Sequence, residues 1–259
     1  YEIDFQMKEF IMSTSSSIDW QIESIRVTAF VNGQLNPDML ETWIEKVSEN
    51  SPSQISKAPS SFDGVSRSTA GFLRTSWNAN RLDVTLSSEQ PQSGQAIAPI
   101  SDAASLFSRF MDRIPEIGEL APVDRLALGL ILTVRVPSEA EGLEILSPSI
   151  VSLNLPRSAR DFLYRVNHPC KSVDGLNLNR LATWSVGHVQ LIRILVNPGG
   201  AQLQQTISES PTAIRLELDL NTDKDMQLGA NLDVLRSLLN ELKTIAVNVA
   251  IGGEATMRE

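Results

Sequence analysis

One short segment brings a thiol, an imidazole and an ammonium group close together, namely His168-Pro169-Cys170-Lys171. A cysteine nucleophile needs a nearby base and a lowered thiol pKa, which His168 or Lys171 could supply. However, no motif typical of a cysteine enzyme surrounds the segment, and a free cysteine is most often a small buried apolar residue. Cys170 is also the only cysteine, which excludes an intramolecular disulfide. We therefore predict no catalytic residue here.

The residue spacing does not match the common motifs for binding a metal ion or a phosphate group. The two histidines, His168 and His188, do not form a helical pair with a carboxylate between them. The chain has neither Gly-x-x-x-x-Gly-Lys-Ser/Thr nor Gly-x-Gly-x-x-Gly opening a helix. The 31 acidic residues leave a carboxylate-only magnesium site open, but Asp223-Lys224-Asp225 is typical of a solvated turn before a helix. The sequence predicts no metal, no cofactor and no enzyme.

The composition indicates a folded globular protein. Of the 259 residues, 42% are apolar and 20% are charged. The 22 basic and 31 acidic residues give a net charge of −9, so the chain lacks the electrostatic footprint of a nucleic-acid-binding protein. The longest apolar run, residues 126–134, is too short to cross a membrane, and no basic stretch precedes an apolar signal core. We expect a cytoplasmic protein that does not bind membranes.

The elements of residues 19–136 predict a first α+β lobe. Apolar and polar residues alternate where strands are expected, and apolar residues recur at helical spacing between them. The resulting order, β-α-β-β-α-β, is the ferredoxin-like (split βαβ) arrangement. The expected elements are a strand at 25–31, a helix at 37–49, a loop at 50–70, a hairpin through Asn78-Ala79-Asn80, a helix at 102–114 and a strand at 126–136.

The rest of the chain predicts a second lobe of the same kind. Residues 137–167 lack a sustained period and are interpreted as a connecting segment, so the second lobe covers residues 168–259. The fold class predicted is α+β, with two ferredoxin-like lobes, a largely antiparallel sheet and the helices on one face. The elements expected here are a strand-like stretch at 176–196 that bends near Gly187, a turn at 197–200, a strand at 214–220 and a helix at 231–248.

Residues 1–18 are predicted to form an N-terminal arm and a serine-rich tether. Tyr1, Ile3, Phe5 and Met7 alternate with polar residues, as in a half-buried strand. Two alternatives remain open for this segment. It is either an N-terminal strand of its own fold or an arm that adds to the sheet of another subunit.

The polar faces of the expected strands carry charges of both signs. Arg74, Arg81 and Arg215 are the candidate interaction residues, and Asp83 and Glu217 stand beside them in the strand pattern. Such mixed charges indicate solvated cross-strand pairs and favour a protein or small-molecule ligand over a phosphate backbone. We predict a non-enzymatic protein-binding or assembly subunit that self-associates or binds a protein partner. The alternative is a regulator that senses a ligand or a nucleic acid on the open sheet face.

Three segments carry a family resemblance: residues 125–130, 216–221 and 235–242. They resemble the later strands and the final helix of a sporadically distributed family of small bacterial α+β proteins of unassigned activity. Members of this family tend to occur in mobile or defence-related gene neighbourhoods. The resemblance covers the last half of the chain and supplies no catalytic residue. It implies an interaction subunit of a bacterial or phage multi-protein system.

Overall fold

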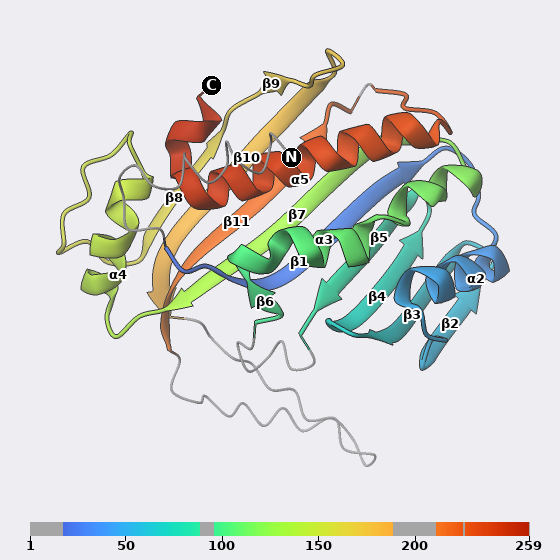
Figure 1. The fold of residues 1–259 in the computed structure, drawn as a ribbon, viewed down its shortest axis with the longest axis horizontal. Coiled ribbons are helices and arrows are strands. Elements are labelled where there is room, and N and C mark those ends of the chain that lie inside the picture. The colour runs from blue at the N-terminus through green and yellow to red at the C-terminus, as the bar shows by residue number, and fades with distance from the viewer. Residues whose placement is uncertain (1–17, 89–95, 189–210, 225, 259) are drawn as a thin grey trace.

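The structure is a computed structural model, and it describes residues 18–88, 96–188, 211–224 and 226–258. In this part of the chain, eleven strands form one sheet, with four α-helices packed beside it (Figure 1). In chain order the elements are β1 (Gln21–Val31), α2 (Pro37–Ser48), β2 (Gln54–Ala58), β3 (Ser61–Ser68), β4 (Gly71–Asn78), β5 (Arg81–Ser87), β6 (Ala98–Pro99), α3 (Ala103–Met111), β7 (Val123–Arg135), α4 (Glu139–Leu146), β8 (Phe162–Asn167), β9 (Cys170–Lys171), β10 (Asn177–His188), β11 (Thr212–Thr222) and α5 (Leu232–Gly252).

The sheet has the order β2-β3-β4-β5-β1-β7-β11-β10-β8, and its neighbouring strands are antiparallel. The long strands β1 and β7 lie side by side at its centre. After β1 the chain forms α2 and then the antiparallel strands β2, β3, β4 and β5. The last of these, β5, pairs with β1. After β7 it forms α4 and then β8, β10 and β11, and β11 returns to β7. The two halves therefore repeat one path and join in one continuous sheet.

The predicted fold class of two ferredoxin-like lobes is wrong. In a split βαβ unit, one antiparallel strand lies between the first strand and the strand that follows the first helix. Here three strands, β3, β4 and β5, lie between β1 and β2, the strand that follows α2, so β2 forms the far edge of the sheet. The error arose in residues 50–70, which we predicted to be a loop. On the buried side of β3, Phe62 is followed by Gly64 and Ser66, so β3 lacks the apolar alternation of a typical strand.

Three helices lie close to their predicted positions. Those expected at 37–49, 102–114 and 231–248 are α2, α3 and α5. Asn36 and Asn231 cap α2 and α5, and the side chain of each accepts a hydrogen bond from the backbone amide two residues later. The predicted hairpin also forms, with β4 and β5 joined by a two-residue turn.

The predicted connecting segment, 137–167, contains α4 and β8. Strand β10 covers the first part of the stretch predicted at 176–196 and ends at His188. The remainder of that stretch and the predicted turn at 197–200 lie outside the described residues.

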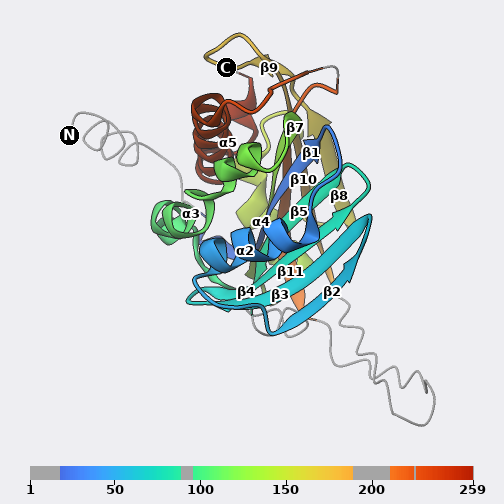
Figure 2. The same ribbon diagram turned by 90° about the vertical axis from the view of Figure 1, so that its right-hand side faces the viewer.

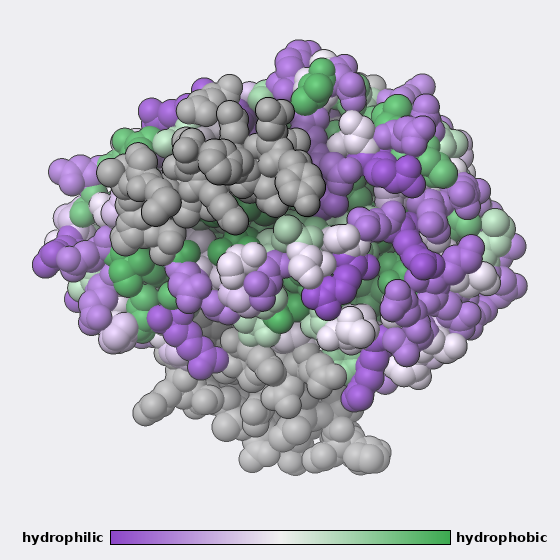
Figure 3. All heavy atoms as spheres, viewed as in Figure 1, coloured by the Kyte–Doolittle hydropathy of each residue, from purple (hydrophilic) through white to green (hydrophobic). Residues whose placement is uncertain are grey.

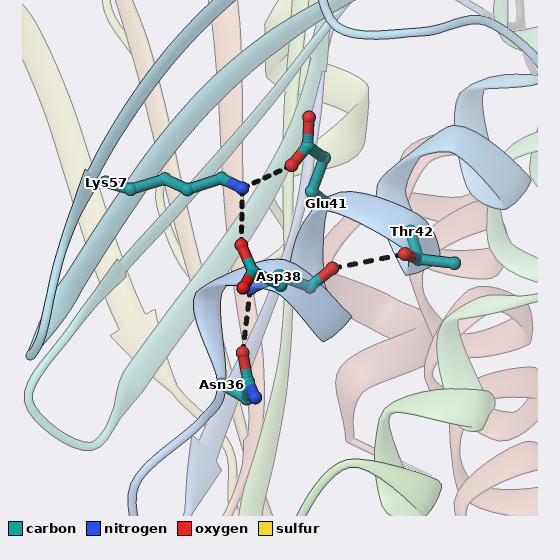
Figure 4. Close-up of polar contacts among 5 residues, drawn as sticks. All are labelled: Asn36, Asp38, Glu41, Thr42 and Lys57. Atoms are coloured by element: carbon teal, nitrogen blue, oxygen red, sulfur yellow. Dashed lines mark hydrogen bonds and ion pairs between the residues drawn. The ribbon is translucent and has the colours of Figure 1, made fainter.

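The edge strand β2 is exposed along its whole length and is tied to α2 by Lys57. The Lys57 ammonium donates a hydrogen bond to Asp38 Oδ1 at 2.7 Å and another to the Glu41 carboxylate (Figure 4). Hydrogen bonds to these two carboxylates raise the pKa of Lys57. One turn along α2, the Thr42 hydroxyl donates to the Asp38 carbonyl oxygen at 3.1 Å. A lysine on an edge strand also discourages pairing with another chain.

One face of the sheet is buried against the helices. Helix α5 packs on β7 and β11, α4 on β10 and β11, and α2 on β3, while Figure 2 shows α3 and α5 on the same side of the sheet. Trp20, just before β1, is 1% exposed, and its Nε1 donates to the Ala250 carbonyl oxygen in α5 at 2.8 Å. The outer surface around α2 is largely hydrophilic (Figure 3). Among the described residues, no helix combines the length and the apolar character needed to cross a membrane.

Candidate functional site

The opposite face of the sheet carries a groove with a volume of about 520 Å³. This face is turned away from α3 and α5 in Figure 2. Because the groove is lined by β5, β1, β7, β11, β10 and β8, it runs across the strands rather than along one of them. Its lining residues include Ser24, Arg26, Gly129, Arg165, Thr183, Glu217 and Asp219.

Residues 129–131 of β7 lie in the floor of the groove. Gly129 lies at the middle of β7, opposite Arg26 of β1 and Asp219 of β11, and Ala127 precedes it on the same face. A Cβ atom added at Gly129 would lie 3.5 Å from Nε and Nη2 of Arg26, so the guanidinium lies over the glycine. A glycine inside a strand weakens the strand and often marks a close approach by a ligand or another backbone. At Gly129 the close neighbour is the Arg26 side chain, for which the glycine leaves room.

Two charged groups in the groove, Arg165 and Asp219, lack an ionic partner among the described residues, and a third, Arg26, has a distant one. Arg26 Nε is 4.0 Å from Asp83 Oδ1, and its side chain is 46% exposed. Arg165 is exposed, and its guanidinium forms no ion pair or hydrogen bond with the described residues. Asp219 accepts a hydrogen bond from Asn221 Nδ2 at 2.9 Å but has no cation within 4 Å in this part of the chain. Of the three, only Arg165 has no polar partner among the described residues.

Arg215 organises the charges beside the groove. Its Nη1 lies 3.2 Å from Glu23 Oε2, and its Nε lies 2.8 Å from Glu217 Oε1. One arginine between two carboxylates leaves this part of the face with a net negative charge. The remaining charges of the groove lining are positive at Arg26 and Arg165 and negative at Asp219.

The structure separates the candidate interaction residues predicted from the sequence. Arg215 lies beside the groove, through its contact with Glu217. Arg74 pairs with Asp63 at 2.8 Å and Arg81 with Asp83 at 2.7 Å, both in the first half of the sheet. The arm residues Tyr1, Ile3, Phe5 and Met7 lie outside the described residues, so both alternatives for the arm stay predictions.

Sequence reasoning missed Gly129, Arg26 and Arg165. The available signal was in the strand predicted at 126–136, where the non-leucine positions include the small residues Ala127 and Gly129. Small residues on the exposed side of a long apolar strand indicate clearance above the sheet. Arg26 and Arg165 carried no such signal, because only the strand order places them on one groove.

His168 Nε2 and the Cys170 thiol are not hydrogen-bonded to each other in the structure. Cys170 is half-buried in β9 and packs against the core. The buried Nε2 atom of His168 has no hydrogen-bond partner among the described residues. Within the described ranges, no three His, Cys, Asp or Glu residues are grouped closely enough to hold a metal ion.

Glu254 forms a second polar cluster, beneath the surface at the C-terminal end of α5. Its side chain is fully buried and accepts hydrogen bonds from the Ser152 amide at 2.8 Å, the Tyr164 hydroxyl at 3.0 Å and Arg258 Nη2 at 3.1 Å. Burial opposes ionisation of Glu254, but hydrogen bonds from Ser152, Arg258 and Tyr164 outweigh it and lower its pKa to about 2. The Glu254 carboxylate is hydrogen-bonded to Tyr164 of β8 and closed to solvent. We therefore interpret the cluster as a structural clamp that joins the segment after α5 to β8.

Comparison of the sequence with models of protein families and with curated proteins gave no match. The resemblance to a sporadically distributed bacterial family stays a prediction.

Proposed function

We propose that this protein is a non-enzymatic protein-binding or assembly subunit, and that its partner occupies the groove on the open sheet face. The observation that carries this proposal is the groove across six strands of the open face, where Gly129 of β7 lies between Arg26 and Asp219 and gives room to the Arg26 guanidinium. The central strands are otherwise well suited to larger side chains, and glycine there costs stability. The family resemblance adds that the partner belongs to a bacterial or phage multi-protein system.

The lining of the groove favours a protein over a nucleic acid. Single-stranded nucleic acids bind through aromatic rings that stack on bases and through basic grooves that follow the phosphates. Among the described residues, the groove is lined by hydroxyl, aliphatic and charged side chains of both signs, without an aromatic ring. The net charge of −9 further disfavours a phosphate backbone.

A bulky side chain at the groove floor is expected to prevent partner binding. The full-length protein is purified with its partner from its source cells, as wild type and as the Gly129→Phe and Gly129→Ala variants. Gly129→Phe is expected to reduce the recovered partner at least tenfold, because its ring fills the groove. Gly129→Ala is the matched control and is expected to retain the partner, since its Cβ makes only an ordinary contact with Arg26. Both variants should keep the wild-type circular dichroism spectrum.

If Gly129→Phe recovered as much partner as the wild type, the proposal that the partner occupies the groove would be wrong. Light scattering after size-exclusion chromatography, with single-stranded and duplex oligonucleotides at low salt, tests the alternative function. A salt-sensitive shift that Gly129→Phe abolishes would replace the proposed function by nucleic-acid sensing.

A further inference from the structure

The outer side of β8 is an edge of the sheet, because β8 pairs only with β10 among the described residues. We infer that this edge is a strand-addition site, and that its occupant is the first eight residues of the same chain. Residues 1–8 then extend the sheet as a strand antiparallel to β8. This inference goes beyond the proposed function, because it concerns the edge of the sheet and does not depend on a partner in the groove.

The side chains of β8 leave an apolar row incompletely covered. Phe162, Tyr164 and Val166 lie on the helix-covered side and pack against the core, but all three are only half-buried. On the opposite side of the strand, Leu163 is 66% exposed. The other edge strand, β2, is exposed along its whole length and carries Lys57, which discourages pairing. Of the two edges, β8 is therefore the one that gains buried apolar surface from an added strand.

Residues 1–8 have the sequence pattern that this edge requires. Tyr1, Ile3, Phe5 and Met7 are apolar and alternate with polar residues. In a strand, these four side chains lie on one side. Placed beside β8, that side covers the half-buried apolar row, and cross-strand pairs of aromatic and large aliphatic residues stabilise a sheet.

The charges select one register for this pairing. Arg165 of β8 and Asp161, directly before β8, are exposed, and neither forms an ion pair with the described residues. When Asp4 lies opposite Arg165, antiparallel pairing places Lys8 opposite Asp161. A shift by two residues in either direction keeps the apolar side chains on the same face but loses at least one of these opposite-charge pairs.

The segment that follows is long enough to bring residues 1–8 to this edge. Gln21, at the start of β1, shares a row with Leu163 of β8 through β7, β11 and β10. Four steps between neighbouring strands, at about 4.8 Å each, separate the two residues by about 19 Å. Residues 9–20 span up to about 40 Å when extended, at about 3.3 Å per residue. They approach β8 from its first residue, which makes the added strand antiparallel.

The helical layer contacts the chain at both ends of this path. Trp20 Nε1 donates a hydrogen bond to the Ala250 carbonyl oxygen at 2.8 Å, and the Tyr164 hydroxyl of β8 donates to the Glu254 carboxylate at 3.0 Å. Ala250 and Glu254 are only four residues apart, so the start of β1 and the edge of β8 meet the same part of this layer. A segment tethered so close has an effective concentration on the order of millimolar, which favours its own chain over a second copy.

Hydrogen exchange of the full-length protein, followed by mass spectrometry, tests this pairing. Residues 1–8 are expected to exchange at least tenfold more slowly than a free synthetic peptide of the same sequence, because pairing with β8 protects their amides. Since the pairing is within one chain, this protection is expected to stay unchanged when the protein is diluted about a hundredfold.

Charge exchange tests the register. Arg165→Glu is expected to lower the protection of residues 1–8 about fivefold, because two like charges then lie opposite each other. Adding Asp4→Arg to this variant is expected to restore the protection. Arg113→Glu is the matched control, because Arg113 is an exposed arginine far from β8 in the fold, directly after α3, and it is expected to change nothing. All variants should keep the wild-type circular dichroism spectrum.

Three results would overturn the inference. They are exchange of residues 1–8 at the rate of the free peptide, equal effects of Arg165→Glu and Arg113→Glu, and failure of Asp4→Arg to restore the protection. Protection that is lost on dilution would overturn the assignment to the same chain and make residues 1–8 of a second copy the occupant. None of these measurements involves the partner, so the recovery experiment with Gly129→Phe tests the proposed function separately.

Discussion

Trp20→Ala is expected to lower the free energy of unfolding by about 3–5 kcal/mol, the range for removing a large aromatic side chain from a packed core. Trp20 is 1% exposed, so the substitution leaves a cavity between the sheet and α5. It also removes the hydrogen bond from Trp20 Nε1 to the Ala250 carbonyl oxygen. Urea unfolding followed by circular dichroism measures the change.

Two further variants separate packing from hydrogen bonding at this position. Trp20→Phe keeps most of the apolar volume but leaves the Ala250 carbonyl without its donor, so we expect a smaller loss of about 1–3 kcal/mol. Met39→Ala is the surface control, since Met39 is 48% exposed and should change stability by less than about 0.5 kcal/mol. Finding Trp20→Ala no more destabilising than Met39→Ala would show that α5 does not depend on this contact.

Glu254→Gln is expected to remove about 3 kcal/mol of stability at neutral pH. The pKa of Glu254 is about 2 in the folded protein, against about 4.5 for an ordinary glutamate, and each pKa unit corresponds to about 1.4 kcal/mol. Because the folded-state pKa is lowered, this stabilisation is complete above about pH 4.5 and is lost as the pH falls towards 2. The difference in stability between wild type and Glu254→Gln should therefore shrink over this interval.

The measurement is urea unfolding of both proteins at several pH values between 2 and 7. Glu119→Gln is the control, because the Glu119 side chain is exposed and outside the clamp. It should follow the wild-type curve throughout. A wild-type to Glu254→Gln difference that stayed constant between pH 7 and pH 2 would mean that the stabilisation does not come from the ionised carboxylate.

The strands that sequence reasoning predicted well are those with regular apolar alternation on the buried side. Strands β7 and β11 bury a leucine-rich row, and both were expected from this period. Strand β2 could not be predicted in this way, because all five of its residues are exposed and its pairing with β3 defines it. The sequence pattern of β3 is also weak, and β3 is a strand because it pairs with β4.

The candidate site was less predictable than the fold, for a related reason. The groove is assembled from six strands, and the distance between Arg26 and Arg165 depends on the order of those strands. Alternation shows which side of a strand is buried, but not which strands are neighbours. Arg215 was named as a candidate because it alternates within a single strand, whereas the position of Gly129 between Arg26 and Asp219 depends on the strand order.

The contact between Trp20 and Ala250 joins residues 230 positions apart, and this has a consequence for synthesis in the cell. The ribosome releases α5 after every strand of the sheet has already been made. Until then, the leucine-rich side of β7 and β11 lacks the helix that covers it. Chains with many such distant contacts fold slowly. Apolar strands that are exposed in the incompletely folded chain are prone to aggregate. We therefore expect nascent chains that stop before residue 232 to require a chaperone to stay in solution.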